Sequence, residues 1–379
     1  MTVEGKVAIV GANGFIGSRA VEMFHLLNLA QVRPIVRRYA GLARLARFEL
    51  GSQGTALDYR VADAFDQAAM KKGFEGCAFV VHAVAGDSET ILGTLAPTYH
   101  AAQAAGVKRF IYLSTASVHG QNPAPGSNEN SPLNMRQPIA YNNAKVKAEQ
   151  VLGQLRAQGN VETVILRPGI VLGPRAIWGA HFADALLAGE AYLMQQGRGI
   201  CNSIYIDNLI HAIYLAMTAP QIDGQAFLVG DQETVTWADV YRPIATALGV
   251  DLDQLPEAIW PDTTPTWLER FDWLREAKPT QALLSRFPMR WRQAAFMGKL
   301  AIEEFFADES LWALSDTSQP EASLEMALLY SCDYKLPIQK AQNLLGYHPP
   351  VSFAEGCQRT VDWLAFAGYP IIAPGEANR

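Results

Sequence analysis

The sequence is poor in cysteine, has no long hydrophobic run and carries no excess of basic residues, and each absence narrows the class of protein. Its four cysteines, Cys77, Cys201, Cys332 and Cys357, are scattered over 379 residues without metal-ligand spacing. We therefore expect reduced structural thiols, with no disulfide framework and no metal site. No apolar stretch reaches the length of a membrane span, and the N-terminus lacks a basic-then-apolar signal segment. From these two absences we expect a cytoplasmic protein without a transmembrane segment. The net charge of −6 gives no sign of nucleic-acid binding, so we expect no nucleic-acid partner.

A glycine-rich segment follows the first apolar run of the chain. The run at 7–10 predicts a strand, and Ala20, Val21, Phe24 and Leu27 predict a helix; between them stands Gly11-Ala12-Asn13-Gly14-Phe15-Ile16-Gly17. A strand that leads through such a turn into a helix gathers backbone N–H groups and the positive end of the helix dipole, where a dinucleotide pyrophosphate can bind. The alternative is a glycine-rich turn without a ligand.

Further apolar runs alternate with helical segments along the chain. They lie at 32–36, 79–82, 110–113, 164–166 and 226–229. This alternation predicts an α/β fold, a Rossmann-type doubly wound parallel sheet with a smaller, mainly helical C-terminal domain. Ligands of such sheets bind beyond the carboxyl ends of the strands.

The residues after the second predicted strand bear on the choice of nucleotide. Arg37 and Arg38 stand twenty residues beyond Gly17, where a protein specific for NAD usually has an acidic residue that binds the ribose. Guanidinium groups would instead bind the 2′-phosphate of NADP, so we favour NADP over NAD. A solvated basic loop is the alternative, because Arg44 and Arg47 follow.

Four segments, taken in order, resemble the extended short-chain dehydrogenase/reductase superfamily. They are the G-x-x-G-x-x-G turn; Leu113 to Gly120, which matches S-[ST]-x-x-V-Y-G with His119 in place of tyrosine; Tyr141 to Lys145, which matches Tyr-x-x-x-Lys; and Arg167 to Pro174, which matches R-P-x-x-V-x-G-P. The Tyr-x-x-x-Lys motif alone would also fit an exposed pair on a helix. The resemblance covers the first 175 residues strongly and continues more weakly at 205–209 and 341–349.

The resemblance implies a catalytic trio of Thr115, Tyr141 and Lys145. Oxidation of a carbinol requires that its proton leave with the hydride, and an unperturbed tyrosine, with a pKa of about 10, is mostly protonated at neutral pH. Lys145 lies one helical turn after Tyr141 and, together with the positive nicotinamide ring, should favour the phenolate. It can also hold the nicotinamide ribose. Thr115 would donate a hydrogen bond to the reacting oxygen.

The same resemblance implies the residues that bind the cofactor and a small-molecule substrate. Asp63 is expected to contact the adenine, although a helix cap is an alternative. His82 is expected to be structural. The expected cofactor-binding residues are Gly11, Asn13, Gly14, Phe15, Ile16, Gly17, Arg37, Arg38, Asp63, Ala64, Ala83, Val84, Ala85, Leu113, Tyr141, Lys145, Pro168, Gly169, Ile170 and Val171. The expected substrate residues are Ser117, His119, Arg175 and Tyr205.

The domain division also follows from the resemblance. Residues 1–175 and about 205–231 are expected to form the Rossmann domain, and about 176–204 and 232–379 the substrate domain. A homodimer is expected as well. Residues 265–300 are unusual for the family, with many aromatic residues among seven Lys/Arg and three Asp/Glu. This insertion fits a lid, a dimer surface, a peripheral membrane helix or ordinary core helices.

Departures from the family pattern restrict the reaction. Dehydratases and many decarboxylases of the family carry a carboxylate where this chain has Ala116 and Ser117, and many epimerases have an arginine at the position of Cys201. We therefore favour an NADP-dependent enzyme that transfers hydride between the cofactor and a secondary alcohol or ketone, similar to the 3β-hydroxysteroid dehydrogenase-like branch. The alternatives are a nucleotide-sugar epimerase with tightly bound NAD(P) and a non-catalytic NADP(H)-binding sensor.

Overall fold

The computed structural model describes residues 4–51, 56–261 and 319–372. The predicted insertion at 265–300 lies outside the described residues. Contacts divide the chain into two compact units, one formed by Met1–Pro256 with Glu325–Arg379 and the other by Glu257–Leu324. In the smaller unit, Ile259 and Glu321 form an isolated parallel bridge. The predicted boundary between a cofactor domain and a substrate domain stays a prediction.

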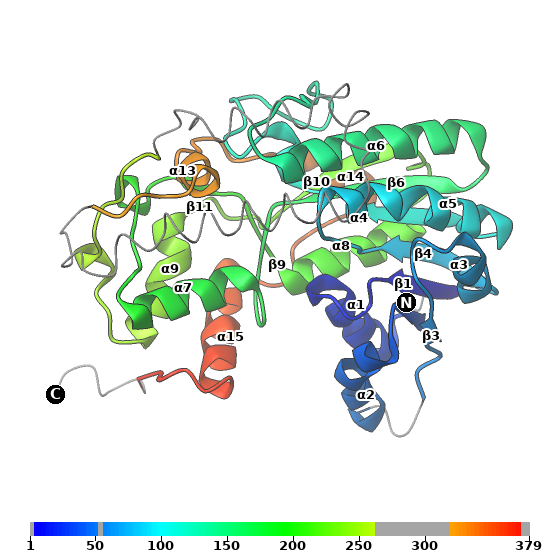
Figure 1. The fold of residues 1–379 in the computed structure, drawn as a ribbon, viewed down its shortest axis with the longest axis horizontal. Coiled ribbons are helices and arrows are strands. Elements are labelled where there is room, and N and C mark those ends of the chain that lie inside the picture. The colour runs from blue at the N-terminus through cyan, green and yellow to red at the C-terminus, as the bar shows by residue number, and fades with distance from the viewer. Residues whose placement is uncertain (1–3, 52–55, 262–318, 373–379) are drawn as a thin grey trace, which may run out of the picture. The chain divides into compact units, whose positions relative to one another are not determined.

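A seven-stranded parallel sheet forms the centre of the larger unit (Figure 1). Its strand order is β10-β6-β5-β4-β1-β2-β3, with neighbours aligned in parallel, as where Val7 lies opposite both Val32 and Phe79. The strands are β1 (Lys6–Val10), β2 (Gln31–Val36), β3 (Arg60–Val61), β4 (Cys77–His82), β5 (Arg109–Leu113), β6 (Glu162–Pro168) and β10 (Gln225–Val229). The apolar runs predicted as strands all lie in this sheet, which confirms the predicted doubly wound fold.

Helices cover both faces of the sheet because side chains alternate between two apolar surfaces along each strand. Val7 and Ile9 point into one core, whereas Ala8 and Val10 point into the other. The first core packs under α1 (Phe15–Leu26), α2 (Leu42–Gly51) and α8 (Ile206–Thr218). The second packs under α3 (Gln67–Phe74), α4 (Ser88–Gly93), α5 (Leu95–Ala104) and α6 (Ala140–Gln158). Figure 1 shows α6 and α8 on opposite sides of the sheet.

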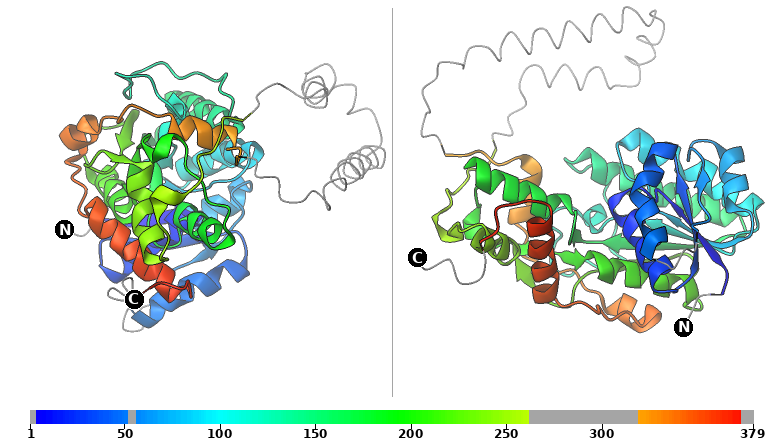
Figure 2. Two further views of the ribbon diagram at one scale, coloured as in Figure 1. Left: turned by 90° about the vertical axis from the view of Figure 1, so that its left-hand side faces the viewer. Right: turned by 90° about the horizontal axis from the view of Figure 1, so that it is seen from below.

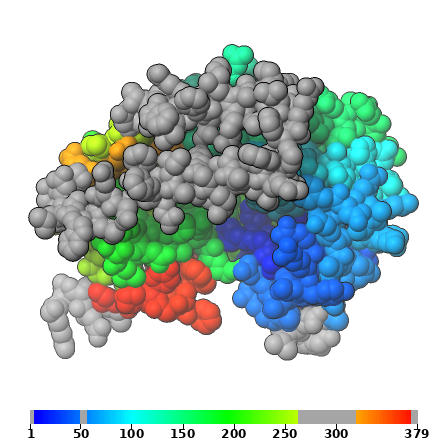
Figure 3. All heavy atoms as spheres, in the orientation of Figure 1, coloured from blue at the N-terminus to red at the C-terminus, as the bar shows by residue number. Residues whose placement is uncertain are grey.

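The remaining elements of this unit follow β6 in the chain. They are β7 (Ile170–Leu172), α7 (Ile177–Ala188), η3 (Gln195–Gly197), β8 (Ile200–Cys201), β9 (Ser203–Tyr205), β11 (Val235–Thr236), α9 (Trp237–Ala247), η4 (Leu252–Gln254), α13 (Leu324–Tyr330), α14 (Gln339–Leu345) and α15 (Phe353–Phe366). Two short ladders, β7–β9 and β11–β8, hold this region together. Figure 1 shows helices α7, α9 and α15 grouped away from the sheet, and Figures 2 and 3 show α15 in red. None of the described helices is both long and apolar enough to cross a membrane.

Candidate active site

The glycine turn joins β1 to α1 at the carboxyl edge of the sheet, as predicted. Gly11 has φ +82°, and a Cβ atom there would lie 2.8 Å from the backbone oxygen of Ala83. A Cβ on Gly17 would lie 2.2 Å from the oxygen of Gly11. Both positions therefore require glycine, because backbone from β1, α1 and the end of β4 meets here with no room for a side chain.

The first turn of α1 is open to an anion. Gly14 is the N-cap residue and supplies no side-chain hydrogen bond to the helix, and it is exposed. The amides at the start of α1 thus lack the side-chain acceptor that usually caps a helix. Asn13 has a buried Oδ1 without a partner in the described part of the chain. These features fit the pyrophosphate of a dinucleotide, since N–H groups and the positive end of the helix dipole converge there.

The basic and acidic residues predicted near the adenosine end lie at the ends of β2 and β3. Arg37 and Arg38 are both exposed, and neither guanidinium has a partner among the described residues. Asp63 accepts a hydrogen bond from the N–H of Phe65 at 3.1 Å, whereas Asp66 caps α3 through the amides of Ala68 and Ala69. The helix-cap interpretation of Asp63 is therefore wrong, because Asp66 has that role.

The segments predicted to flank the cofactor also lie at this edge. Ala83 extends β4 and donates its N–H to Val10 at 3.0 Å, and Val84 and Ala85 follow it. Across the sheet, Pro168 ends β6 and Gly169 leads into β7. A Cβ on Gly169 would lie 1.9 Å from the oxygen of Asn202, so the chain can pass only without a side chain.

Tyr141 and Lys145 lie on the first turns of α6. The Lys145 ammonium is buried and donates to the oxygen of Leu113 at 2.8 Å and to the hydroxyl of Tyr112 at 3.4 Å. Its nitrogen lies 5.9 Å from the centre of the Tyr141 ring. Burial lowers the pKa of Lys145 to about 8, although the charge of Glu149 opposes the shift. The structure thus fixes the lysine to the end of β5 and beside the tyrosine.

The Tyr141 side chain is 37% exposed, so a ligand can reach it. The surrounding protein nevertheless removes enough water to raise the pKa of its phenol to about 12, and the negative charge of Glu325 adds to the effect. The phenol is consequently protonated at neutral pH in the structure as it stands. A cation near the ring would favour the phenolate.

Two adjacent hydroxyl groups after β5 have different surroundings. Ser114 donates to Glu149 at 2.5 Å, and Glu149 forms a buried ion pair with Arg167 at 2.6 Å. Thr115 instead caps the 3₁₀ turn η2 (Ala116–His119), accepting the N–H of Ser117 at 3.2 Å. The O–H of Thr115 remains able to donate, whereas the hydroxyl of Ser114 is committed to Glu149. Of the two hydroxyl groups, Thr115 is thus the one left to meet a substrate, and its catalytic role stays a prediction.

The two histidines near the site are neutral. Burial and the positive charge of Lys145 lower the pKa of His82 to about 3, and its Nε2 lies 3.4 Å from the hydroxyl of Thr94. Burial and the charge of Arg167 lower the pKa of His119 to about 4, and the Nε2 of His119 lies 3.2 Å from Arg167. His119 borders a hollow of about 1020 Å³ beneath the loop at 121–138.

A separate hollow of about 340 Å³ adjoins η2 and β7 and contains Ser117. No charged side chain from the described part of the chain lines it. Gln121 in this lining donates to Glu325 at 2.7 Å, while its own Oε1 is buried without a partner among the described residues. The hollow is lined by Ala116, Ser117, Gly120, Gln121, Pro123, Gly169, Ile170, Ile200, Cys201, Asn202, Trp237, Leu329 and Leu336.

Sequence analysis did not identify several of these lining residues. Trp237, Leu329 and Leu336 come from segments far along the chain, and no motif marks them. Gln121 directly follows the Leu113 to Gly120 motif, so its position was the available signal. Cys201 was noted only as the residue that replaces an arginine.

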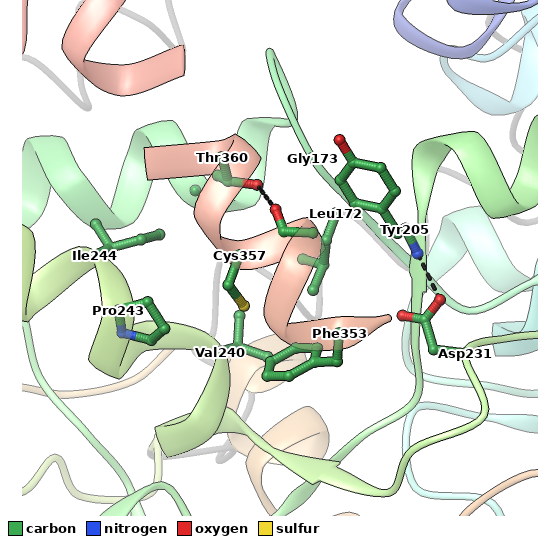
Figure 4. A pocket seen from close by; sticks show the side chains of 12 residues that line it. Leu172, Gly173, Tyr205, Asp231, Val240, Pro243, Ile244, Phe353, Cys357 and Thr360 are labelled. Atoms are coloured by element: carbon green, nitrogen blue, oxygen red, sulfur yellow. Dashed lines mark hydrogen bonds between the residues drawn. The ribbon is translucent and has the colours of Figure 1, made fainter. Parts of the chain in front are cut away.

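The structure does not bring the two other predicted substrate residues to this hollow. Tyr205 lies instead beside a mostly apolar pocket of about 450 Å³ between α9, α15 and the end of β7 (Figure 4). Asp231 borders the same pocket, but it accepts hydrogen bonds from Tyr205 N, Ser203 and Asn208 and is therefore structural. Arg175 donates to Ser18 on α1 at 3.3 Å and so lies near the glycine turn. Their roles as substrate residues stay predictions.

A glycine turn at the carboxyl edge of a doubly wound sheet, with a tyrosine beside a buried lysine, defines a class: Rossmann-fold enzymes of the dehydrogenase/reductase type. Residues 7–230 match the model of the NAD dependent epimerase/dehydratase family. The chain belongs to this family, within the extended short-chain dehydrogenase/reductase superfamily.

Individual relatives fall on two sides of the family. The chain is 29% identical to UDP-glucose 4-epimerase of Vibrio cholerae over 67% of its own length and 79% of the relative. It is 30% identical to 3 beta-hydroxysteroid dehydrogenase/Delta 5-->4-isomerase of Mycobacterium tuberculosis over 65% of its own length and 70% of the relative. Among solved structures, UDP-glucuronic acid 4-epimerase of Bacillus cereus in complex with UDP-glucuronic acid and NAD has a TM-score of 0.65 at 17% identity, with 96% and 99% of the two chains covered.

Proposed function

We propose that the protein is an NADP-dependent oxidoreductase that transfers hydride between the cofactor and a secondary alcohol or ketone. The observation that carries the proposal is the buried Lys145 ammonium, held on the oxygen of Leu113 beside the accessible phenol of Tyr141. A protein that only binds the cofactor has no need of an accessible phenol beside this ammonium, whereas hydride transfer to a ketone requires a group that gives the proton.

The cofactor-binding residues fit a dinucleotide. The uncapped start of α1 and the close-packed glycines would hold the pyrophosphate, and the unpartnered Arg37 and Arg38 would bind a 2′-phosphate. A nicotinamide bound between the ends of β4 and β6 would give or accept the hydride. The preference for NADP rests on the two arginines alone.

The proton chemistry belongs to Tyr141. In the direction of reduction its phenol donates the proton to the developing alkoxide, and in the direction of oxidation its phenolate accepts it. Lys145 lies close enough to favour the phenolate electrostatically. Thr115, whose O–H has no acceptor among the described residues, donates a hydrogen bond to the same substrate oxygen.

The lining of the hollow next to η2 supports a largely apolar substrate. Ile170, Trp237 and Leu336 line it, and Cys201, at the position where many epimerases have an arginine, is fully buried and uncharged. The unpartnered Oε1 of Gln121 would accept a hydrogen bond from a hydroxyl or amide of the substrate. The steroid substrate named for the Mycobacterium tuberculosis relative has this chemistry, and we extend the class to this chain.

A deuterium-transfer experiment tests the reaction. NADPH deuterated at C4 of the nicotinamide is incubated with the protein and a panel of apolar cyclic ketones, and the alcohols are analysed by mass spectrometry. We expect deuterium at the carbinol carbon of at least one product and none with Tyr141→Phe. Absence of transfer across the panel, together with interconversion of UDP-sugars, would refute the proposal.

Nucleotide-sugar epimerisation is the second candidate. It is supported by the similarity to the Vibrio cholerae epimerase and by Lys335, which borders a hollow next to the first one and could meet a diphosphate. Burial lowers the pKa of Lys335. An epimerase would regenerate its cofactor in each cycle, so it would convert UDP-glucose to UDP-galactose without added NAD(P)H.

The family resemblance also leads us to propose a homodimer in the cytoplasm. Light scattering coupled to gel filtration would test the dimer, since a monomer has a mass of 41.5 kDa.

A further inference from the structure

Arg175 has a backbone conformation that glycine usually takes. Its φ is +69°, in the left-handed region, where a Cβ atom meets the carbonyl group. Asn28, Gln195, Gln196 and Gln221 are the other described non-glycine residues with positive φ. The side chain of Arg175 makes a hydrogen bond to α1 beside the glycine turn. Strain of this kind persists where the side chain has a use.

The Arg175 side chain reaches the start of α1 from the segment between β7 and α7. Its Nη1 donates to Ser18 Oγ at 3.3 Å. Ser18 is fully buried, and its Oγ donates in turn to the oxygen of Phe15, the first residue of α1, at 3.2 Å. One guanidinium is thereby fixed against the helix turn whose amides lack a side-chain cap.

A second guanidinium is hydrogen-bonded to the glycine-rich segment. Arg44 on α2 donates to the backbone oxygen of Asn13 at 2.8 Å, within the glycine-rich segment. Helices α1 and α2 lie next to each other in Figure 1. Two arginines separated by more than a hundred residues in sequence are thus each hydrogen-bonded to the glycine turn or to the helix that follows it.

These positive charges have little compensation within the protein. Burial and the charges of Arg44 and Arg47 lower the pKa of Arg175. The carboxylate on the same face, Glu22, is already paired with Arg19 at 3.0 Å and lies 3.9 Å from Arg47. Cations that repel each other at an uncapped helix start provide a site for a strongly anionic group.

We propose that Arg175 and Arg44 close over the glycine turn as a clamp for the pyrophosphate that NAD and NADP share. This inference rests on the proposed nucleotide binding, and it moves Arg175 from the expected substrate residues to the cofactor site. It assigns the two groups of arginines different tasks. Arg175 and Arg44 increase the affinity for both dinucleotides, whereas Arg37 and Arg38 distinguish the 2′-phosphate.

Arg175→Gly is the main variant, because glycine adopts the observed φ without strain and the fold should not suffer. Arg175→Lys keeps the charge but lacks the planar guanidinium. Arg242→Ala is the matched control, since Arg242 on α9 forms an exposed ion pair with Asp253 at 3.0 Å. Dissociation constants are measured by calorimetry for NADPH, NADH, ADP and AMP. Thermal unfolding of each variant without nucleotide reports the integrity of the fold.

We expect Arg175→Gly and Arg44→Ala each to weaken the binding of NADPH, NADH and ADP by about tenfold or more, the effect of losing a charge-assisted hydrogen bond. The binding of AMP should weaken much less. The affinity of Arg175→Lys for these nucleotides should lie between those of the wild type and Arg175→Gly. The affinity of Arg242→Ala should match that of the wild type. Unchanged affinities in a folded Arg175→Gly protein would refute the clamp, and so would a loss confined to NADPH. If the wild-type protein binds neither dinucleotide, the proposed function itself fails, which is a different outcome.

Discussion

Replacing Glu149 by alanine removes the carboxylate that forms a buried ion pair with Arg167 and accepts a hydrogen bond from Ser114. Glu149 and Arg167 have side chains only 5% and 6% exposed, and they lie 2.6 Å apart. Coulomb's law with an effective dielectric constant of 20 gives an attraction of about 6 kcal/mol at that distance, before the desolvation of both groups is subtracted. Alanine would leave the Arg167 guanidinium buried without its counter-ion, and it would leave the hydroxyl of Ser114 without its acceptor.

The expected loss of unfolding free energy is about 3–5 kcal/mol, the range for breaking one side of a buried pair. Against a total stability of about 5–15 kcal/mol, this loss is large. A double variant, Glu149→Leu with Arg167→Met, should be less destabilised than Glu149→Ala, because it leaves no unpaired buried charge. The matched exposed pair is Arg242–Asp253, where Asp253→Ala should change stability by less than about 1 kcal/mol.

The assay is urea unfolding at pH 7, followed by tryptophan fluorescence, with the slope of each transition compared between variants. Two results would contradict the reasoning. One is a loss below about 1 kcal/mol for Glu149→Ala, which would mean that water reaches the pair. The other is a double variant at least as unstable as the single one.

Three further predictions concern the proposed catalytic and cofactor residues. Tyr141→Phe should lower turnover about a hundredfold or more in a steady-state assay while calorimetry shows unchanged cofactor binding; near wild-type turnover would exclude Tyr141 as the proton donor. Arg37→Ala should weaken the binding of NADPH far more than that of NADH in the same titration. Equal weakening would show that Arg37 does not bind the 2′-phosphate. Since the pKa of Lys145 is lowered from 10.5 to about 8, the folded protein binds fewer protons than the unfolded chain between these values, and Lys145 makes stability rise with pH there. Lys145→Met should lose this rise, at most about 3 kcal/mol, in urea unfolding at pH 8 and pH 10; identical pH trends in both proteins would contradict the buried ammonium.

The local parts of the site could be predicted from sequence because each is encoded in a short segment. The glycine turn, the strand that precedes it and the helix that follows occupy consecutive residues, and the structure has them as expected. Tyr141 and Lys145 are one helical turn apart, so their common face follows from the helix period. The order of the apolar runs likewise predicted the parallel sheet.

Contacts between distant segments could not be predicted in the same way. The approach of Arg175 to Ser18 depends on the path of the chain after β7, and the positive φ of Arg175 has no sequence signature. The pairing of Glu149 with Arg167 brings together a helix and a strand whose register is set by packing. The sequence could not decide whether Asp63 caps the following helix, because Asp66, three residues later, is an equally good capping residue.

The most direct test of the account is to identify the nucleotide released when the purified protein is denatured, and to titrate the stripped protein with NADPH and NADH. The account predicts a readily exchanged site that binds NADPH more tightly than NADH. Stoichiometric, tightly held NAD would contradict the roles given to Arg37 and Arg38 and would make the epimerase the better description.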